Sequence, residues 1–419
     1  MSSIQLNGIA YRLPDDPVVV VCIDGGDPSY FDRGIADGIM PTVARFLREG
    51  YATVAAGTVP SFTCPNNMSI VTGAAASVHG ISGNYYLDRA SGEAVVMTGP
   101  ELLRSSTVLA EFSRAGEKVL AITAKDKLRR QLSKGMDLAN GSISFSSEKA
   151  DRCALAENGI ENVTDLVGMP VPHMYSPELS LFVLEAGIRL IESRRPRVSF
   201  LSLSDWIQHK HAPGEPESDA FHAALDDCFR RLDALGAVVA LTADHGMNDK
   251  SLEDGSPNVV WLQDILDAEL GPGRTRVICP ITDYFVAHHG ALGGFVRVWC
   301  QDGASPQAVI EIARRQPGIE RVLDGPTAAR EFDLPLDREG DVVVIGDRGT
   351  CIGAARADHD LSGLAGHRLR SHGALTEARV PFILNRPLAP EYVRRATAGL
   401  KSHQIFDYAI NGTLAGAAA

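Results

Sequence analysis

Carboxylate and imidazole side chains recur at short spacings in this chain. Asp205 and His209 are four residues apart, so one helical turn would point both side chains at the same place. Asp244 and His245 are adjacent, and Asp24 lies far from them in the sequence. Carboxylate oxygens and imidazole nitrogens are the donors that open catalytic zinc sites use. These five side chains therefore indicate a divalent metal centre.

Each of these residues also has an ordinary structural interpretation. An isolated Asp after a strand commonly caps the next helix, and an isolated His is commonly a hydrogen-bonded structural residue. His211 competes with His209, and the spacing from Asp205 is the reason to favour His209. Several clustered carboxylates, however, repel one another unless a cation lies between them. The metal interpretation therefore rests on the set and not on any single member.

A candidate nucleophile lies in the segment from Gly57 to Met68. This segment is predicted to be a turn that leads into a helix, with Pro65 in the first helical turn. Thr63 would then lie at the helix N-terminus, where free backbone N–H groups and the helix dipole stabilise an alkoxide and a phosphoryl group. Ser61 and Cys64 compete for the role, and Thr63 or Cys64 could be a simple helix cap. A threonine hydroxyl is inert unless a base or a metal activates it, so this segment depends on the metal site.

The apolar runs before these side chains predict how the chain positions them. Three continuous runs are typical of strands buried on both faces, and each is followed by one of the carboxylates. Helical patterns separate the runs, which favours a largely parallel sheet whose ligands bind beyond the carboxyl ends of the strands. A fourth strand would place Lys125 and Lys127 on the same rim. The predicted strands are Val18–Ile23, Val119–Ile122, Val198–Leu203 and Ala237–Leu241, and the predicted helices include Pro177–Ser193 and Ala220–Leu235.

A different pattern begins near residue 267 and ends near residue 358. Phe295–Trp299 alternates like a half-exposed strand, Pro306–Arg315 is helical, and Val342–Ile345 is another short strand. We expect residues 267–358 to be an inserted α+β cap subdomain, and residues 1–266 and 359–419 to form the catalytic core.

The composition bounds the partners of the protein. Of 419 residues, 45% are hydrophobic and 22% charged, which is typical of a globular protein. Forty Lys and Arg against 52 Asp and Glu give a net charge of −12, which disfavours nucleic acid and anionic membranes. An anionic substrate would therefore have to be attracted locally, by a metal or by a few placed cations.

The remaining global features concern location and assembly. The seven cysteines include no CxxC pair, which disfavours a disulfide framework or a thiolate zinc site. Met1–Pro17 has no long apolar run, and no later stretch reaches membrane-spanning length, so we expect a cytoplasmic protein without a signal peptide or membrane anchor. Base rates of symmetry favour a homodimer.

The order of these segments resembles the alkaline phosphatase superfamily, and more closely its nucleotide pyrophosphatase/phosphodiesterase-like branch. The resemblance implies an α/β fold in which a largely parallel central sheet is flanked by helices and carries an inserted cap. The segments that carry it are Ile23-Asp24-Gly25, Phe62-Thr63-Cys64-Pro65-Asn66, Val71-Thr72-Gly73, His79-Gly80-Ile81 and Asp244-His245-Gly246-Met247.

This resemblance also implies two Zn²⁺ ions per subunit. Asp24, Thr63, Asp244 and His245 would surround one zinc ion, and Asp205, His209 and His372 the other. His372 has the Ser and Gly neighbours of the family's late histidine, whereas His367 lacks them. His79, His288 and His289 match family segments as structural or supporting residues. Alkaline phosphatases proper use a serine with an arginine clamp and an extra magnesium site, whereas Thr63 has no arginine nearby, which favours the diesterase-like branch.

Within that branch the whole chain is similar to hydrolases of carboxylated phosphonates. The similarity implies hydrolysis of the carbon–phosphorus bond of phosphonoacetate to acetate and phosphate through a phosphothreonine at Thr63. A simple carbanion leaves very poorly, but an α-carboxylate lets the carbon leave as an enolate if cations hold that carboxylate. We expect Lys125 and Lys127 to supply this charge and Asn84 to donate to a phosphonyl oxygen. The segments involved are Ser77–Tyr85, Thr123–Leu128 and His288–Gly293.

Several alternatives stay open at this point. The two lysines could lie in a solvated loop, and Gly83-Asn84 is also a turn signal. A phosphodiesterase or nucleotide pyrophosphatase would use the same metals but prefer aromatic surfaces to paired lysines. A sulfatase would carry an arginine after Cys64-Pro65, which is absent here. A binding protein that kept the metal site but lost catalysis is a further possibility.

Overall fold

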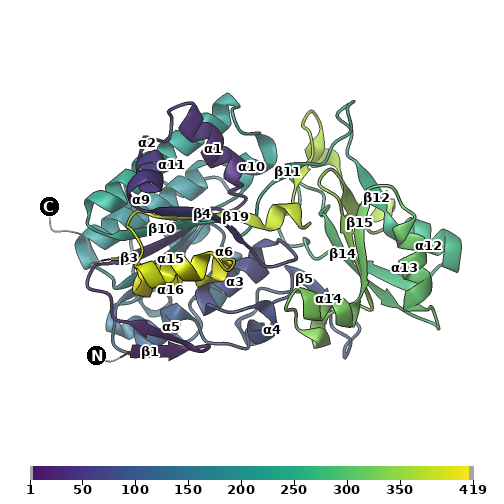
Figure 1. Cartoon of the computed structure of the whole chain (residues 1–419), viewed down its shortest axis with the longest axis horizontal. Helices are drawn as coiled ribbons and strands as arrows, with labels where there is room; N and C mark the ends of the chain where they lie inside the picture. Colours follow the sequence, from purple (N-terminus) through teal and green to yellow (C-terminus); the bar gives the residue numbers. More distant parts are fainter. Residues whose placement is uncertain (1–2, 415–419) are drawn as a thin grey trace.

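The four apolar runs predicted as strands lie within a seven-stranded sheet (Figure 1). In sheet order the strands are β4 (Tyr51–Ala56), β19 (Arg379–Leu384), β10 (Val238–Thr242), β3 (Val18–Cys22), β9 (Val198–Ser202), β7 (Val119–Thr123) and β8 (Ile143–Ser146). This computed structural model describes residues 3–414. Strands β10, β3, β9, β7 and β8 are parallel, and β19 and β4 add an antiparallel edge. The largely parallel α/β core is therefore confirmed.

Two layers of helices pack on the sheet, one on each face, because successive side chains of a buried strand point to opposite faces. In β3, Val19 and Val21 belong to one apolar core, whereas Val18 and Val20 belong to the other. Helices cover both faces (Figure 1). The first layer contains α1 (Pro28–Ala36), α2 (Pro41–Glu49), α8 (Val163–Val167), α9 (Glu178–Arg194) and α11 (Pro216–Ala234), and the second contains α3 (Thr63–Thr72), α5 (Val108–Arg114), α6 (Asp126–Leu132), α15 (Pro390–Ala396) and α16 (Ile405–Asp407).

A second, antiparallel sheet of four strands has an apolar core of its own and lies beside the first (Figure 1). Helices α12 and α13 pack on it, and α12 begins before residue 267. We propose that residues 267–358 constitute the inserted cap, with α12 packed against its strand β13. The elements are α12 (Leu262–Leu270), β13 (Thr275–Ile278), β14 (Phe295–Cys300), α13 (Pro306–Arg314), β15 (Ile319–Asp324), α14 (Gly325–Glu331) and β16 (Val342–Gly346).

Short strands and short α-helices lie between these elements, along with several segments of 3₁₀ and π helix. The short strands and α-helices are the hairpins β1 (Ser3–Leu6) with β2 (Ile9–Arg12) and β5 (Tyr85–Leu87) with β6 (Ala94–Val96), the pairs β11 (Asn248–Asp249) with β18 (Arg370–Ser371) and β12 (Val259–Trp261) with β17 (Cys351–Gly353), and the helices α4 (Ala76–His79), α7 (Leu155–Asn158) and α10 (Trp206–Lys210). None of the helices within residues 3–414 is long and apolar enough to span a membrane.

One detail of the predicted insertion was wrong. Phe295–Trp299 was expected to be a half-exposed strand, but all five residues are buried. Arg297, which made the pattern alternate, is fully buried because its guanidinium pairs with Glu339 and donates to the backbone oxygen of Ser82 at 3.0 Å. A paired cation can thus occupy a core position that composition alone assigns to solvent.

The chain passes Phe62 very closely at Gly373. Gly373 has a φ of +117°, and a Cβ atom at this position would lie 2.5 Å from the Phe62 ring. The preceding peptide oxygen, on His372, accepts the N–H of Gly294 at 2.8 Å. The absence of a side chain at Gly373 therefore lets three distant segments meet.

We expect Gly373→Ala to destabilise the protein by about 3 kcal/mol, because the new methyl group meets both an unfavourable φ and the Phe62 ring. Gly366→Ala is the matched control, since Gly366 has a φ of +78° with no atom within 4 Å of the added Cβ. That variant should lose only about 1 kcal/mol. Urea unfolding measures both, and equal losses would show that the Phe62 contact is unimportant.

Candidate metal centre and active site

The three predicted carboxylates follow three neighbouring strands. Asp24, Asp205 and Asp244 come after β3, β9 and β10, which are adjacent in the sheet in the order β10-β3-β9. All three residues are at most 4% exposed. Parallel strands end at the same edge, so the backbone brings the three carboxylates together there.

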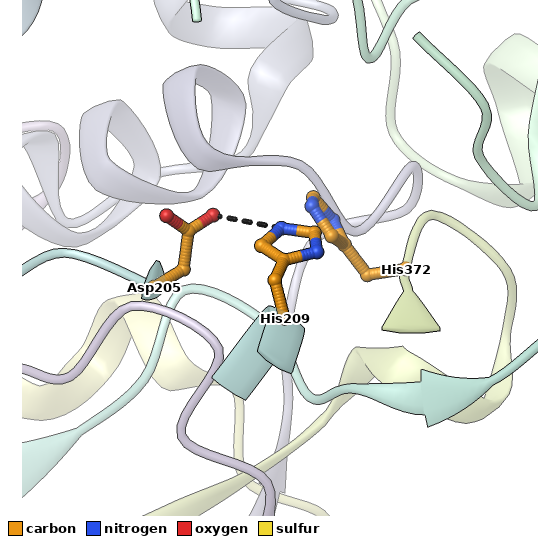
Figure 2. Close-up of side chains that lie close together, drawn as sticks. All are labelled: Asp205, His209 and His372. Carbon is orange, nitrogen blue, oxygen red and sulfur yellow. Dashed lines mark hydrogen bonds and ion pairs between the residues drawn. The ribbon is translucent and has the colours of Figure 1, made fainter. Parts of the chain in front are cut away.

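Imidazoles complete two groups of potential ligands. Ligand atoms of Asp205, His209 and His372 lie within 4.8 Å of one another, and so do those of Asp24, Asp205 and His245. Figure 2 shows the first group, in which Asp205 Oδ2 is 3.0 Å from His209 Nε2. Asp205 belongs to both groups and therefore lies between them. Asp244 belongs to neither group, although its Oδ2 is 3.8 Å from His245 Nε2.

The backbone fixes the orientation of all three imidazoles. The Nδ1–H of His209 donates to the Arg370 oxygen at 2.7 Å, and that of His372 donates to the Ser61 oxygen at 2.7 Å. His245 Nδ1–H donates to the Gly246 oxygen at 2.9 Å. Because a carbonyl only accepts, Nδ1 carries the proton in each ring and Nε2 is left to bind a metal.

The charges of this cluster are unbalanced without a cation. Burial raises the pKa of Asp244 well above its usual value, and the Asp24 carboxylate raises it further. Burial would lower the pKa of His245, but Asp244 and Asp24 raise it to about 9. Asp24 Oδ1 is buried and makes no hydrogen bond within the described residues, although it lies 3.2 Å from His245 Nε2. These residues therefore fit divalent metal ions, which would satisfy the carboxylates and keep the imidazoles neutral.

The three candidate nucleophiles have different surroundings. Ser61 Oγ donates a hydrogen bond to the backbone oxygen of Ala374 at 2.7 Å, so its proton is already used in a structural contact. Burial raises the pKa of the Cys64 thiol to about 12, which leaves no thiolate near neutral pH. Thr63 begins helix α3, and its Oγ1 lies 3.5 Å from His245 Nε2. The threonine hydroxyl is therefore the one that adjoins the metal-binding cluster.

Both predicted lysines are buried at the edge of the cluster. Lys125 Nζ is 3.0 Å from Asp205 Oδ1, and Lys127 forms an ion pair with Asp283. The two lysine side chains are 7% and 4% exposed, so the solvated-loop alternative was wrong. Burial disfavours both ammonium groups, but the nearby carboxylates keep the pKa of each above its usual value. This rim of the sheet thus holds two ammonium groups, each paired with a carboxylate.

Asn84 lies beside the start of α3. Its Oδ1 accepts the Cys64 N–H at 2.9 Å, and its Nδ2 donates to the Ile281 oxygen at 3.2 Å. The second N–H of this amide has no protein partner among the described residues. Asn84 is therefore well placed next to Thr63, with one donor to spare.

The rival histidines lie in other surroundings. His211 pairs with Glu215 at 3.2 Å and is partly exposed, and His367 is exposed. His79 forms a hydrogen bond with Ser69 Oγ of α3 at 2.9 Å and accepts the Ile81 N–H, so it connects α3 to the segment that follows α4. Of the described histidines outside the two ligand groups, the adjacent pair His288 and His289 lies against the cluster, with rings 4.4 and 5.3 Å from that of His209.

Sequence reasoning missed Asn67, which joins three parts of the site. Its Nδ2 donates to Asp244 Oδ2 at 3.1 Å and to the Thr63 backbone oxygen at 3.0 Å, and its Oδ1 accepts from Ser202. Asn67 therefore aligns a carboxylate with the helix that carries Thr63. Its position four residues after Thr63, one helical turn away, is the signal that could have identified it.

Comparison with known families agrees with this geometry. Residues 18–373 match the profile of the type I phosphodiesterase/nucleotide pyrophosphatase family. The chain belongs to this family. Membership places it in the metal-dependent alkaline phosphatase superfamily and confirms that it is a hydrolase.

Two kinds of solved structure are similar to this chain, at very different levels of identity. Phosphonoacetate hydrolase from Sinorhizobium meliloti 1021, solved in complex with phosphonoformate and with phosphonoacetate, is 43% identical, with a TM-score of 0.92 over 97% of this chain and 98% of that one. Murine ectonucleotide pyrophosphatase/phosphodiesterase 5 in complex with AMP is 16% identical, with a TM-score of 0.63 over 96% of each chain. The second similarity shows the fold alone.

We expect chelation of bound divalent metal to lower the melting temperature by about 5 °C, because the buried carboxylates lose their counter-ions. Differential scanning calorimetry before and after dialysis against a chelator, with metal analysis of each sample, measures the effect. Asp205→Asn, which alters both ligand groups, should bind less metal and respond less to the chelator. An unchanged melting temperature and no bound metal in the untreated protein would contradict the assignment.

Proposed function

We propose that this protein hydrolyses the carbon–phosphorus bond of phosphonoacetate to acetate and phosphate, with two zinc ions and Thr63 as nucleophile. The observation that carries the proposal is the pair of buried ammonium groups beside the metal-binding cluster, with Lys125 Nζ 3.0 Å from Asp205 Oδ1. A phosphate ester offers no carboxylate to such a pair, whereas phosphonoacetate does. The 43% identity to a phosphonoacetate hydrolase over nearly the whole chain supports the same substrate.

The proposed ligands form two sets, one for each of two zinc ions, at the same edge of the sheet. Asp24, Thr63, Asp244 and His245 would hold one ion, and Asp205, His209 and His372 would hold the other. When bound, the zinc ions lower the pKa of bound hydroxyl groups and water and neutralise charge on the phosphonyl oxygens. The carboxylate-imidazole donor set and the three Nδ1–H bonds to carbonyl oxygens favour zinc over calcium or magnesium, which prefer oxygen ligands alone.

Thr63 attacks phosphorus from the N-terminus of α3. The Thr63 hydroxyl gives up its proton to water, and its oxygen forms a new bond to phosphorus as the carbon–phosphorus bond breaks. The electron pair of the broken bond passes to the departing carbon. The Thr63 N–H at the start of α3 and the spare N–H of Asn84 orient the phosphonyl oxygens. The product of this half-reaction is a phosphothreonine.

The leaving group requires stabilisation at its carboxylate. The electron pair on carbon delocalises into that carboxylate as an enolate, where Lys125 and Lys127 place two positive charges. The carbon then takes a proton from water to give acetate. Hydrolysis of the phosphothreonine by water releases phosphate and restores the Thr63 hydroxyl.

A phosphodiesterase activity is the second candidate, and one cavity favours it. Tyr175 and Tyr284 line a cavity of about 360 Å³, and the Tyr175 ring lies 5.8 Å from the ring of His288. Aromatic walls of this kind suit a nucleobase or an aryl group. Phosphate or nitrophenol release from phosphonoacetate, phosphonopyruvate and bis(p-nitrophenyl) phosphate, measured side by side, separates the two activities. Turnover of the diester alone would overturn the proposed function.

We expect Thr63→Ala to lower kcat for phosphonoacetate by about 10⁴-fold or more, because the variant loses the hydroxyl that forms the covalent intermediate. Metal content and melting temperature should stay near those of the wild type. Thr63→Ser keeps a hydroxyl and should retain measurable turnover, and its phosphorylated form should be detectable by mass spectrometry after acid quenching. Near-wild-type activity of the alanine variant would exclude Thr63 as the nucleophile.

Replacing either rim lysine should distinguish the leaving-group role from general anion binding. We expect Lys125→Ala and Lys127→Ala each to lower kcat/KM for phosphonoacetate by about 100-fold, since the enolate loses a cation. Turnover of bis(p-nitrophenyl) phosphate, whose leaving group has no carboxylate, should fall far less. Equal losses on both substrates would refute the role.

A further inference from the structure

A segment of the proposed cap contacts both rim lysines. Between β13 and β14 the chain leaves the second sheet, and Asp283 forms an ion pair with Lys127 of α6 in the core. The side chains of Asp283 and Lys127 are 6% and 4% exposed. This ion pair therefore joins the two parts of the molecule inside the site, and nothing in the sequence pattern pointed to it.

The same segment covers the lysines with an aromatic ring. The ring centroid of Phe285 lies 5.6 Å from Lys125 Nζ and 5.8 Å from Lys127 Nζ. The face of a phenyl ring attracts ammonium groups at this distance and keeps water from them. Phe285 also donates its backbone N–H to Asp283 Oδ1 at 2.6 Å, which fixes the carboxylate relative to the ring.

The geometry leaves Lys127 able to bind a second anion. An ammonium group has three N–H donors, and within residues 3–414 the Asp283 carboxylate is the sole side-chain hydrogen-bond partner of Lys127 Nζ. A lysine this deeply buried would tend to lose its charge without a carboxylate beside it. Asp283 thus secures both the charge and the direction of the ammonium group.

We propose that Asp283 is a positioning residue for substrate selection: it holds Lys127 toward the substrate carboxylate, under the cover of Phe285. The proposal rests on the proposed function, because it concerns the carboxylate of the same substrate. In this arrangement Asp283 does not touch the substrate. It acts through Lys127, and the cap thereby contributes to the preference for phosphonates that carry a carboxylate.

A competing arrangement has the opposite consequence. If Asp283 instead occupied the place of the substrate carboxylate and left on binding, its removal would vacate that place. Asp283→Asn would then lower KM for phosphonoacetate. The hydrogen bond from Phe285, which anchors Asp283 in its own segment, favours the positioning role.

The test is a double-mutant cycle on the full-length metal-loaded enzyme. Asp283→Asn should lower kcat/KM for phosphonoacetate by about 30-fold or more, since the charge pair is broken inside the protein. Lys127→Met should lower it at least as far, and the double variant should be no worse than Lys127→Met alone. Losses that simply multiply would overturn the proposal, as would a lower KM for Asp283→Asn.

Two further measurements separate positioning from general damage. Inorganic phosphate lacks a carboxylate, so its inhibition constant in Asp283→Asn should stay within about threefold of the wild-type value. Asp283→Glu should recover part of the lost activity. Glu269→Gln, at an exposed ion pair with Arg315 in the second sheet's helical layer, is the control for removing an acid, and it should behave as wild type.

The outcomes also distinguish this inference from the proposed function. If the wild type does not hydrolyse phosphonoacetate, the proposed function fails. If the wild type does so and Asp283→Asn keeps its kcat/KM within about threefold, only the role of Asp283 fails. A parallel loss of phosphate binding, metal content and melting temperature in Asp283→Asn would assign Asp283 a structural role and overturn the proposal.

Discussion

Repulsion among Asp24, Asp205 and Asp244 is the constraint on which the rest of the site depends. Three buried carboxylates at the ends of three adjacent strands are unfavourable unless positive charge lies between them. The surrounding structure supplies imidazoles that are oriented by backbone carbonyl oxygens, and Lys125 forms an ion pair with Asp205. Divalent metal ions bound between these ligands would relieve the repulsion and would make the site electrophilic.

The second sheet matters because it brings groups that the core lacks. The core supplies the carboxylates and the start of α3, but Asp283, Phe285 and the His288-His289 pair all lie between β13 and β14. They reach the edge of the core sheet and exclude solvent from the two lysines. A dry pocket strengthens the interaction of these ammonium groups with an anion, which matters in a chain whose overall charge is negative.

The family membership and the local chemistry carry different information. One fold can support several activities, so the fold shared with the murine protein at 16% identity does not fix the substrate. The metal-binding cluster alone does not distinguish one substrate from another either. We propose that the distinction lies in the lysines of the core and in the segment that covers them.

The sequence by itself determined the strands of the core and the residues that follow them. Short apolar runs separated by helical patterns are typical of strands buried on both faces, so the parallel sheet and the common edge for Asp24, Asp205 and Asp244 could be predicted from local pattern. The choice of His372 over His367 came from a family resemblance, because spacing does not rank two histidines so close together. Only the tertiary structure decided the contacts of Asn67 and Asp283, and the burial of Arg297. Each of these contacts involves a partner that is distant in the chain. The local sequence pattern around a polar side chain does not predict which distant residue it will contact.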